Sequence, residues 1–169
     1  QLQADNALLK DRVFVDTLTQ AYTREYLAQR SALEMAQSRE SGSSLYFVMF
    51  DLDKFKRIND ELGHVDGDNA LRRLSQVTKD IVRKADVFAR FGGDEFVLLL
   101  PNISEQNALN LVDKVREGIN AIVISEVSLS SSFGVTLMQQ SDTLETLIQR
   151  ADRALYASKE KGGNTITLK

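Results

Sequence analysis

Two adjacent carboxylates stand at a turn between two apolar segments, and this feature restricts the fold more than any other. The segment reads Arg90-Phe91-Gly92-Gly93-Asp94-Glu95-Phe96 and continues into Val97-Leu98-Leu99-Leu100. Glycine adopts the positive φ that a two-residue hairpin demands, so Gly92-Gly93 predicts a tight strand, turn and strand. The two acids at its tip indicate chemistry, although Gly-Gly-Asp is also an ordinary turn composition.

A second acidic pair follows another apolar run. Residues 45–50 are short, aromatic and β-branched, which predicts a buried strand, and Asp51 and Asp53 follow it. Carboxylates at the end of a buried strand are costly unless they have partners, and Mg²⁺ commonly takes one or two carboxylates with phosphates and water. Asp51 and Asp94 are therefore candidates for a shared metal site that would neutralise a triphosphate. The alternatives for Asp51 and Asp53 are solvated loop acids or an N-cap for a helix beginning near Lys54.

The composition fits one compact domain with an appended segment. A chain of 169 residues with 43% hydrophobic residues can build a full core. The chain has no cysteine and a single histidine, which excludes disulfides, argues against zinc and favours a reducing compartment. A net charge of −3 argues against nucleic acid as a partner. The apolar runs are strand-sized, so we expect no membrane contact by this piece and a cytoplasmic location, either free or as part of a membrane-anchored protein.

Periodicity gives the order of elements. Residues 1–15 have helix-compatible spacing, and we interpret them as a stalk cut from a longer protein, or as an amphipathic helix on the domain that residues 16–169 form. The expected helices cover about 22–39, 54–62, 67–82, 104–120 and 144–159. The expected strands cover about 45–50, 86–91, 95–100, 127–137, with a bulge at Gly134, and 165–168. The order β-α-α-β-β-α-β, then a helix and an edge strand, predicts an α/β (α+β), ferredoxin-like core: a central, mostly antiparallel sheet flanked by helices.

Five separated motifs occur in one order along the chain. They are Asp16-Thr17-Leu18-Thr19, Phe50-Asp51-Leu52-Asp53-Lys54-Phe55-Lys56 with Ile58-Asn59-Asp60, Gly63-His64 with Gly67-Asp68, the Arg90 to Phe96 segment, and Ala151-Asp152 with Ala154-Leu155-Tyr156. From about Asp16 to its C-terminus the chain resembles the GGDEF-domain diguanylate cyclases. The resemblance implies a nucleotidyl-cyclase fold and the condensation of two GTP into cyclic di-GMP and two pyrophosphates. It also implies an antiparallel homodimer and a sensory module upstream.

The resemblance assigns catalytic and metal-binding roles residue by residue. Asp51, the Leu52 backbone carbonyl and Asp94 become ligands of Mg²⁺, or of Mn²⁺ in its place. Asp94 and Glu95 become the residues that activate the attacking hydroxyl, and which of them takes the proton stays open.

The resemblance also assigns the binding residues. Asn59 and Asp68 match the guanine-reading positions, where a carboxylate and an amide can discriminate against adenine; helix caps are the alternative for both. His64 would lie near the substrate. The remaining residues would bind phosphates or product. Lys56 and Lys159 match positions that meet the β- and γ-phosphates, or are solvated lysines, and Arg83 and Asp86 match a product-inhibition motif, or form a surface ion pair.

Three positions depart from the usual family pattern. Residues 20–24 read Gln-Ala-Tyr-Thr-Arg in place of Gly-Leu-x-Asn-Arg, which puts the shape of the entry loop in question, and Ser158 replaces an alanine without expected effect. Gly163 replaces an arginine, which predicts weaker triphosphate binding and a lower KM for GTP in Gly163→Arg. An active cyclase with product feedback is the first reading of function. A catalytically weak or inactive domain that binds GTP or cyclic di-GMP as a regulatory module is the second, and a structural dimerisation module is a distant third.

Overall fold

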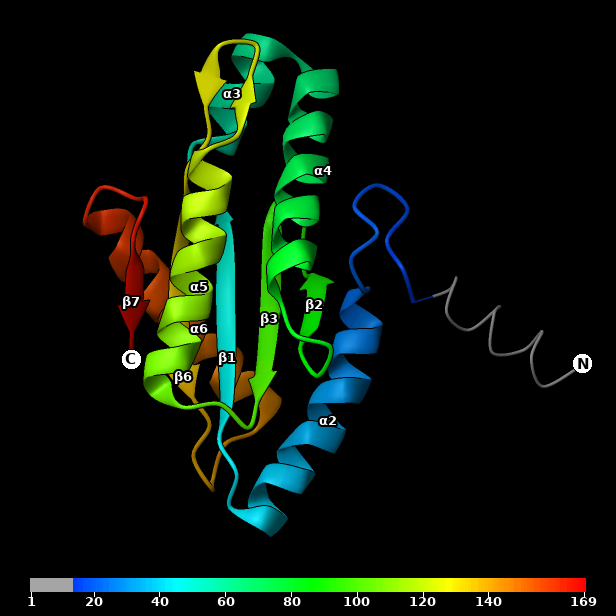
Figure 1. The fold of residues 1–169 in the computed structure, drawn as a ribbon, viewed down its shortest axis with the longest axis vertical. Helices are drawn as coiled ribbons and strands as arrows, with labels where there is room; N and C mark the ends of the chain where they lie inside the picture. The colour runs from blue at the N-terminus through cyan, green and yellow to red at the C-terminus, as the bar shows by residue number, and fades with distance from the viewer. Residues whose placement is uncertain (1–13) are drawn as a thin grey trace, which may run out of the picture.

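A five-stranded sheet with helices on both faces forms the described part of the chain (Figure 1). The computed structural model describes residues 14–169, so the predicted stalk lies outside it except for its last two residues. The strand order is β2-β3-β1-β6-β7, and among these neighbours β6 and β7 are parallel while the others are antiparallel. The predicted mostly antiparallel sheet flanked by helices is therefore confirmed.

The elements follow the predicted order, with an additional short hairpin. Among the helices between residues 14 and 169, none combines the length and the apolar character that a membrane span requires. The predicted strand over 127–137 is wrong in its first part, because β4 and β5 form a separate two-stranded hairpin before β6 begins. The elements are α2 Arg24–Ser41, β1 Leu45–Leu52, α3 Phe55–Leu62, α4 His64–Ile81, β2 Val87–Arg90, β3 Glu95–Pro101, α5 Glu105–Asn120, β4 Val123–Ile124, β5 Val127–Ser128, β6 Ser131–Leu137, α6 Leu144–Glu160 and β7 Ile166–Leu168.

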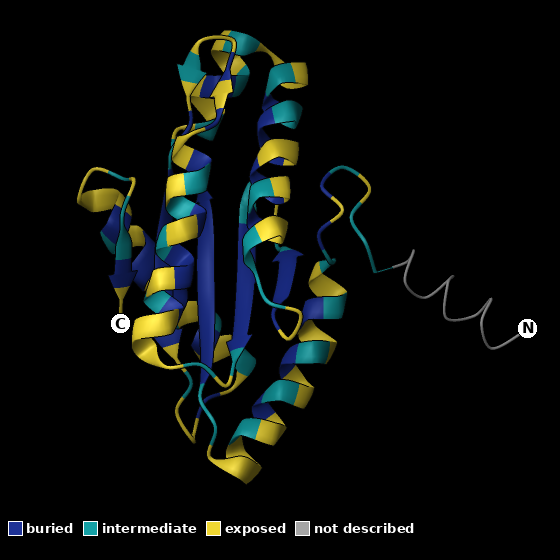
Figure 2. Ribbon diagram, in the orientation of Figure 1, coloured by how far each residue is buried: buried dark blue, intermediate teal, exposed yellow. Residues whose placement is uncertain are grey.

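Side chains alternate along the central strand β1, so each face of the sheet has its own core. Val48 and Phe50 pack in a cluster with side chains of α4 and α5, while Phe47 and Met49 pack in a second cluster with side chains of α2 and α6. Figure 2 shows the strands β1 and β2 as buried and the outer faces of the helices as exposed. Because the alternation continues beyond Met49, Asp51 points to the same face as α6.

The glycine in β6 serves close packing. Gly134 pairs in regular register with Met49, so the predicted bulge is wrong. A Cβ at Gly134 would overlap the carbonyl oxygen of Ala151 and the amide nitrogen of Leu155. Glycine therefore lets the backbone of α6 approach the sheet closely at this point.

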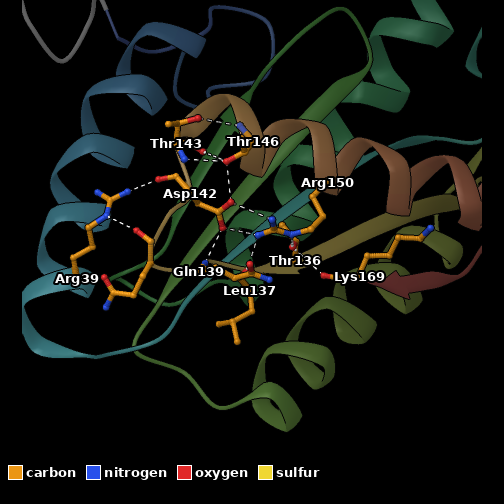
Figure 3. A network of polar contacts seen from close by, with 10 residues as sticks. Arg39, Thr136, Leu137, Gln139, Asp142, Thr143, Thr146, Arg150 and Lys169 are labelled. Atoms are coloured by element: carbon orange, nitrogen blue, oxygen red, sulfur yellow. Dashed lines mark hydrogen bonds and ion pairs between the residues drawn. The ribbon is translucent and has the colours of Figure 1, made fainter.

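A polar network fixes the first turns of α6 (Figure 3). Arg150 forms an ion pair with Asp142, with 2.6 Å between Nη2 and Oδ2, and also donates to the Thr136 hydroxyl. Asp142 accepts a further hydrogen bond of 2.8 Å from the Thr146 hydroxyl. The Arg150 hydrogen bond is the main reason that the pKa of Asp142 falls to about 2, against the opposing effect of burial.

Candidate active site

The β2–β3 connection brings Asp94 and Glu95 beside the end of β1. Glu95 is the cross-strand partner of Asp51, and Asp94 directly precedes Glu95 in the connection. The two acidic segments that the sequence singles out therefore meet at one edge of the sheet. Figure 1 shows this end of β1 below α3, with α4 running along the sheet.

An arginine, rather than glycine conformation, fixes the shape of this turn. Neither Gly92 nor Gly93 has φ in the left-handed range, so the predicted two-residue hairpin turn is wrong. The Arg90 guanidinium donates to the Gly93 carbonyl at 2.6 Å and lies 3.2 Å from a carboxylate oxygen of Asp16. Arg90 and Asp16 have no assigned role in the sequence analysis, although each stands in one of the five motifs.

Asp51 is a buried carboxylate with a single close counter-charge. The residue is 7% exposed, and its Oδ1 lies 2.8 Å from Nζ of Lys159 and has no other polar partner among residues 14–169. Burial raises the pKa of Asp51 to about 6; Lys159 opposes this shift, and the charges of Asp94 and Asp53 add to it. Additional positive charge near Asp51 would favour its ionised form further.

The oxygen donors fit a hard divalent cation that takes its remaining ligands from outside the protein. Asp51 and Asp94 offer carboxylates, and Leu52 offers a backbone carbonyl at the end of β1. Within residues 14–169, no three His, Cys, Asp or Glu side chains are arranged to hold a metal by themselves. Phosphate oxygens and water would supply the remaining ligands, as is usual for Mg²⁺. The helix-cap alternative for Asp51 is wrong, because Lys54 is the N-cap of α3 and makes no side-chain capping bond.

Glu95 lies among charges of both signs. Burial raises the pKa of Glu95 and the charges of Asp94 and Asp152 raise it further, while Lys159 and Arg24 oppose the shift. Arg24 is the first residue of α2, and its guanidinium carbon lies 4.0 Å from the centroid of the Phe91 ring. Neither Asp152 nor Arg24 has an assigned role in the sequence analysis, because only the fold brings α2 and α6 to the turn.

Asp53 connects separate segments of the chain next to the candidate site through hydrogen bonds. Its carboxylate accepts hydrogen bonds from the hydroxyls of Ser130 at 2.7 Å and Ser132 at 2.5 Å, and from the Asn164 amide at 2.8 Å. It is therefore neither a solvated loop acid nor a helix cap. It ties the end of β1 to β6 and to the turn that follows α6.

Gly163, which stands where the family usually has an arginine, lies in the turn after α6. Gly163 has a φ of +79°, in the left-handed range that favours glycine. A Cβ at this position would lie 2.9 Å from Oδ2 of Asp53, so any side chain there requires Asp53 to move. Weaker triphosphate binding remains a prediction.

The residues with an expected guanine-binding role lie at the corner between α3 and α4. Asn59 is not the helix cap, because Gly63 is the C-cap of α3 and its amide donates to the Asn59 carbonyl at 2.9 Å. Asp68 is not a cap either, since α4 begins at His64. Both side chains are half-buried, whereas Lys56 and His64 are exposed.

Residues 20–24, the entry loop, depart from the family sequence but still lead into a capped helix. Gln20 adopts a φ of +62° at the position where the family usually has glycine. Thr23 replaces the usual asparagine and caps α2 by accepting a hydrogen bond of 3.3 Å from the Tyr26 amide. The departure at residues 20–24 therefore leaves the start of α2 intact.

The expected product-inhibition residues lie at the opposite end of β2 from the turn. Arg83 and Asp86 form an ion pair of 2.6 Å between Nη2 and Oδ1, and Asp86 also accepts from the Arg83 amide at 2.7 Å. The Asp86 side chain is fully buried, while that of Arg83 is 37% exposed. Only the guanidinium of this pair is open to a ligand as the pair stands.

Comparisons with known proteins identify the family of the chain. The family model described as "Diguanylate cyclase, GGDEF domain" matches residues 13–165. The diguanylate cyclase DosC of Escherichia coli K12 is 35% identical over 164 residues, which cover 94% of this chain and 36% of that protein. The chain thus spans about a third of the length of this curated relative.

Two solved structures have the same fold. Diguanylate cyclase SiaD of Pseudomonas aeruginosa, solved with its activator SiaC, superposes with a TM-score of 0.93 at 31% identity, covering 99% of this chain and 66% of that one. The GGDEF domain of DgcB from Caulobacter crescentus, solved with c-di-GMP, gives 0.88 at 25% identity, covering 92% and 95%. With the acids, the turn and the fold in place, the chain belongs to the GGDEF-domain family of diguanylate cyclases.

Proposed function

We propose that this chain is a cyclase domain that condenses two GTP into cyclic di-GMP and two pyrophosphates. One observation carries the proposal: the buried Asp51 is the cross-strand neighbour of Glu95, which follows Asp94 in the chain. The close counter-charge of the Asp51 carboxylate is Lys159. A domain that only dimerises or only supports a fold has no need for three acids at one sheet edge, because such acids repel one another and lose solvation.

Asp51, Asp94 and the Leu52 carbonyl would hold the divalent cation, for which we propose Mg²⁺, with Mn²⁺ as a substitute. When bound, such a cation neutralises phosphate charge and lowers the pKa of a nearby hydroxyl. Asp94 or Glu95 would accept the proton of the attacking hydroxyl. Lys159 and Lys56 would bind the β- and γ-phosphates.

The proposed nucleotide selectivity comes from the corner between α3 and α4. Asp68 would accept hydrogen bonds from the guanine N1 and N2 groups, and the Asn59 amide offers both a donor and an acceptor. Adenine would leave these groups unpaired, at a cost of about 1–3 kcal/mol for each lost contact. His64 lies at the start of α4, near the same corner.

Two copies of the chain are needed for the reaction. Each domain would hold one GTP, and the 3′-oxygen of each nucleotide would attack the α-phosphorus of the other. Two P–O bonds form, two pyrophosphates leave, and each hydroxyl proton passes to a carboxylate. We therefore propose an antiparallel homodimer in the cytoplasm, where GTP is available, under the control of a sensory module elsewhere in the full protein.

Product analysis tests the proposed reaction. The purified chain is incubated with GTP and Mg²⁺, and the nucleotides are resolved by chromatography, with Asp51→Asn as the matched control. We expect cyclic di-GMP and pyrophosphate from the wild type, and a rate lower by at least about a hundredfold in the variant, because electrostatic support of the reacting phosphates is lost. GTP that stays intact with the wild type at every protein concentration would refute the proposal.

A regulatory binding module is the second candidate, and Gly163 is the observation that favours it. Without the usual arginine, a domain could bind GTP or cyclic di-GMP and pass that state to a partner without turnover. Equilibrium binding of GTP in the absence of any product separates this candidate from the cyclase.

We also propose product feedback through Arg83 and Asp86. The half-exposed Arg83 guanidinium could contact a phosphate or the edge of a guanine, and the DgcB domain that shares this fold was solved with c-di-GMP. Because Asp86 is buried against Arg83, product binding would have to share or open this ion pair. Inhibition by added product should weaken in Arg83→Ala; inhibition equal to that of the wild type would remove the assignment.

A further inference from the structure

Gly67 lies in the first turns of α4, packed against the carboxamide of Asn59. The residue is buried, and its amide donates to the Gly63 carbonyl at 3.0 Å as part of the helix. A Cβ built on Gly67 would overlap Oδ1 of Asn59 and lie 3.0 Å from its Cγ. The three atoms nearest to such a Cβ all belong to the Asn59 carboxamide.

Backbone conformation does not explain this glycine. Gly67 has no φ in the left-handed range, and glycine is less favourable than alanine in a helix interior. The contrast with Gly134 is informative, because there the obstructing atoms are the backbone of α6, which cannot move without shifting the sheet. At Gly67 the obstructing group is the end of a half-buried side chain that can rotate away. A methyl group at position 67 would therefore displace Asn59 rather than disrupt the fold.

We propose that Gly67 is a positioning residue for nucleotide selectivity. The absence of a side chain at position 67 leaves space for the Asn59 carboxamide and keeps that group in one orientation. The inference rests on the proposed function, in which Asn59 and Asp68 read guanine. It extends that function by assigning part of the guanine preference to a residue that makes no contact through a side chain of its own.

A double-mutant cycle tests the proposal. Four proteins are compared: the wild type, Gly67→Ala, Asn59→Ala and the double variant. For each we measure kcat and KM with GTP, the ratio of kcat/KM between GTP and ATP, and the thermal midpoint of unfolding. We expect Gly67→Ala to fold, to raise the KM for GTP on the order of tenfold to a hundredfold, and to reduce the preference for GTP. Its kcat at saturating GTP should change much less. In the Asn59→Ala background, Gly67→Ala should leave KM unchanged and raise the thermal midpoint.

Each other outcome has a clear meaning. A Gly67→Ala variant with wild-type KM and wild-type preference for GTP overturns the positioning role and leaves the cyclase proposal intact. An equal rise in KM with and without the Asn59 side chain overturns it too, because the effect would then not pass through Asn59. A wild-type chain that neither converts GTP nor binds it with Mg²⁺ refutes the proposed function, and the positioning role with it.

Discussion

A carboxylate buried at the end of β1 is the residue on which the proposed chemistry depends, and its position is unfavourable for folding. Asp51 loses solvation, faces two further acids and has one lysine as a counter-charge. Sites of this kind exchange stability for function. Asp51→Asn keeps the size of the side chain but removes the charge, so we expect its free energy of unfolding to be equal to or above that of the wild type, measured by denaturant without divalent cations. A clear loss of stability in the variant would mean that the ion pair with Lys159 is mainly structural.

A second prediction at the scale of single residues concerns Gly163. We expect Gly163→Arg to lower the KM for GTP, because it restores a guanidinium near the phosphates. We also expect a lower thermal midpoint, because the new side chain combines a left-handed φ with displacement of Asp53; a non-glycine residue in this region costs about 1–2 kcal/mol. Steady-state kinetics and thermal unfolding measure the two effects separately.

The control for this variant is Gly163→Ala. It introduces the same strain without a charge, so it should lower the thermal midpoint without lowering KM. If the arginine variant binds GTP no better than the alanine variant, the missing arginine does not limit triphosphate binding in this chain.

At the scale of elements, the start of α6 depends on one ionised carboxylate. The pKa of Asp142 is depressed to about 2 in the folded chain, compared with its ordinary value of 3.8. A depressed pKa means that the stabilisation is complete above about pH 4 and is lost as the pH falls toward 2. The shift corresponds to about 1–2 kcal/mol after allowance for solvent screening.

Acid unfolding of Asp142→Asn tests this dependence. The variant should be less stable than the wild type at neutral pH, since the hydrogen bonds from Arg150 and Thr146 weaken. The difference between the two should shrink as the pH falls from 4 to 2, because the wild type then loses the same interaction. Unfolding curves that stay equally far apart throughout this range would show that Asp142 does not titrate as described.

The elements that the sequence predicted best are those with a strong local pattern. The apolar run of β1, the strands on each side of the Gly-Gly-Asp-Glu turn and the long amphipathic helices all follow from periodicity and capping residues. The β4–β5 hairpin escaped prediction because each of its strands has two residues, too few to show alternation. The role of Gly134 escaped it because a close approach by α6 leaves no trace in the residues around that glycine.

The site was predictable where its motifs are adjacent in the sheet. Asp51 and Glu95 meet because the two strands that carry them pair directly. The hydrogen bonds that hold the segments around these two acids were not predictable from local sequence pattern. Asp53 binds Ser130 across 77 residues and Arg90 binds Asp16 across 74 residues, and an isolated serine or arginine does not indicate its distant partner.

At the scale of the whole molecule, the proposed site is half of a reaction centre. Each chain would position one nucleotide at the ends of β1 and β3, and the second must come from another copy. The chain spans 36% of DosC, and in the proposed reaction two copies of this chain must meet. Turnover by this domain alone should then be limited by encounter, which is second order in protein.

The dependence of turnover on protein concentration tests the central claim most directly. Initial rates of cyclic di-GMP formation are measured at saturating GTP and Mg²⁺ over a wide range of chain concentrations. We predict that the product forms and that the rate per chain rises with concentration until the dimer is saturated. A rate per chain that is constant down to the lowest measurable concentration, or the absence of product at every concentration, would contradict the claim that two copies join their strand-end sites to make the dinucleotide.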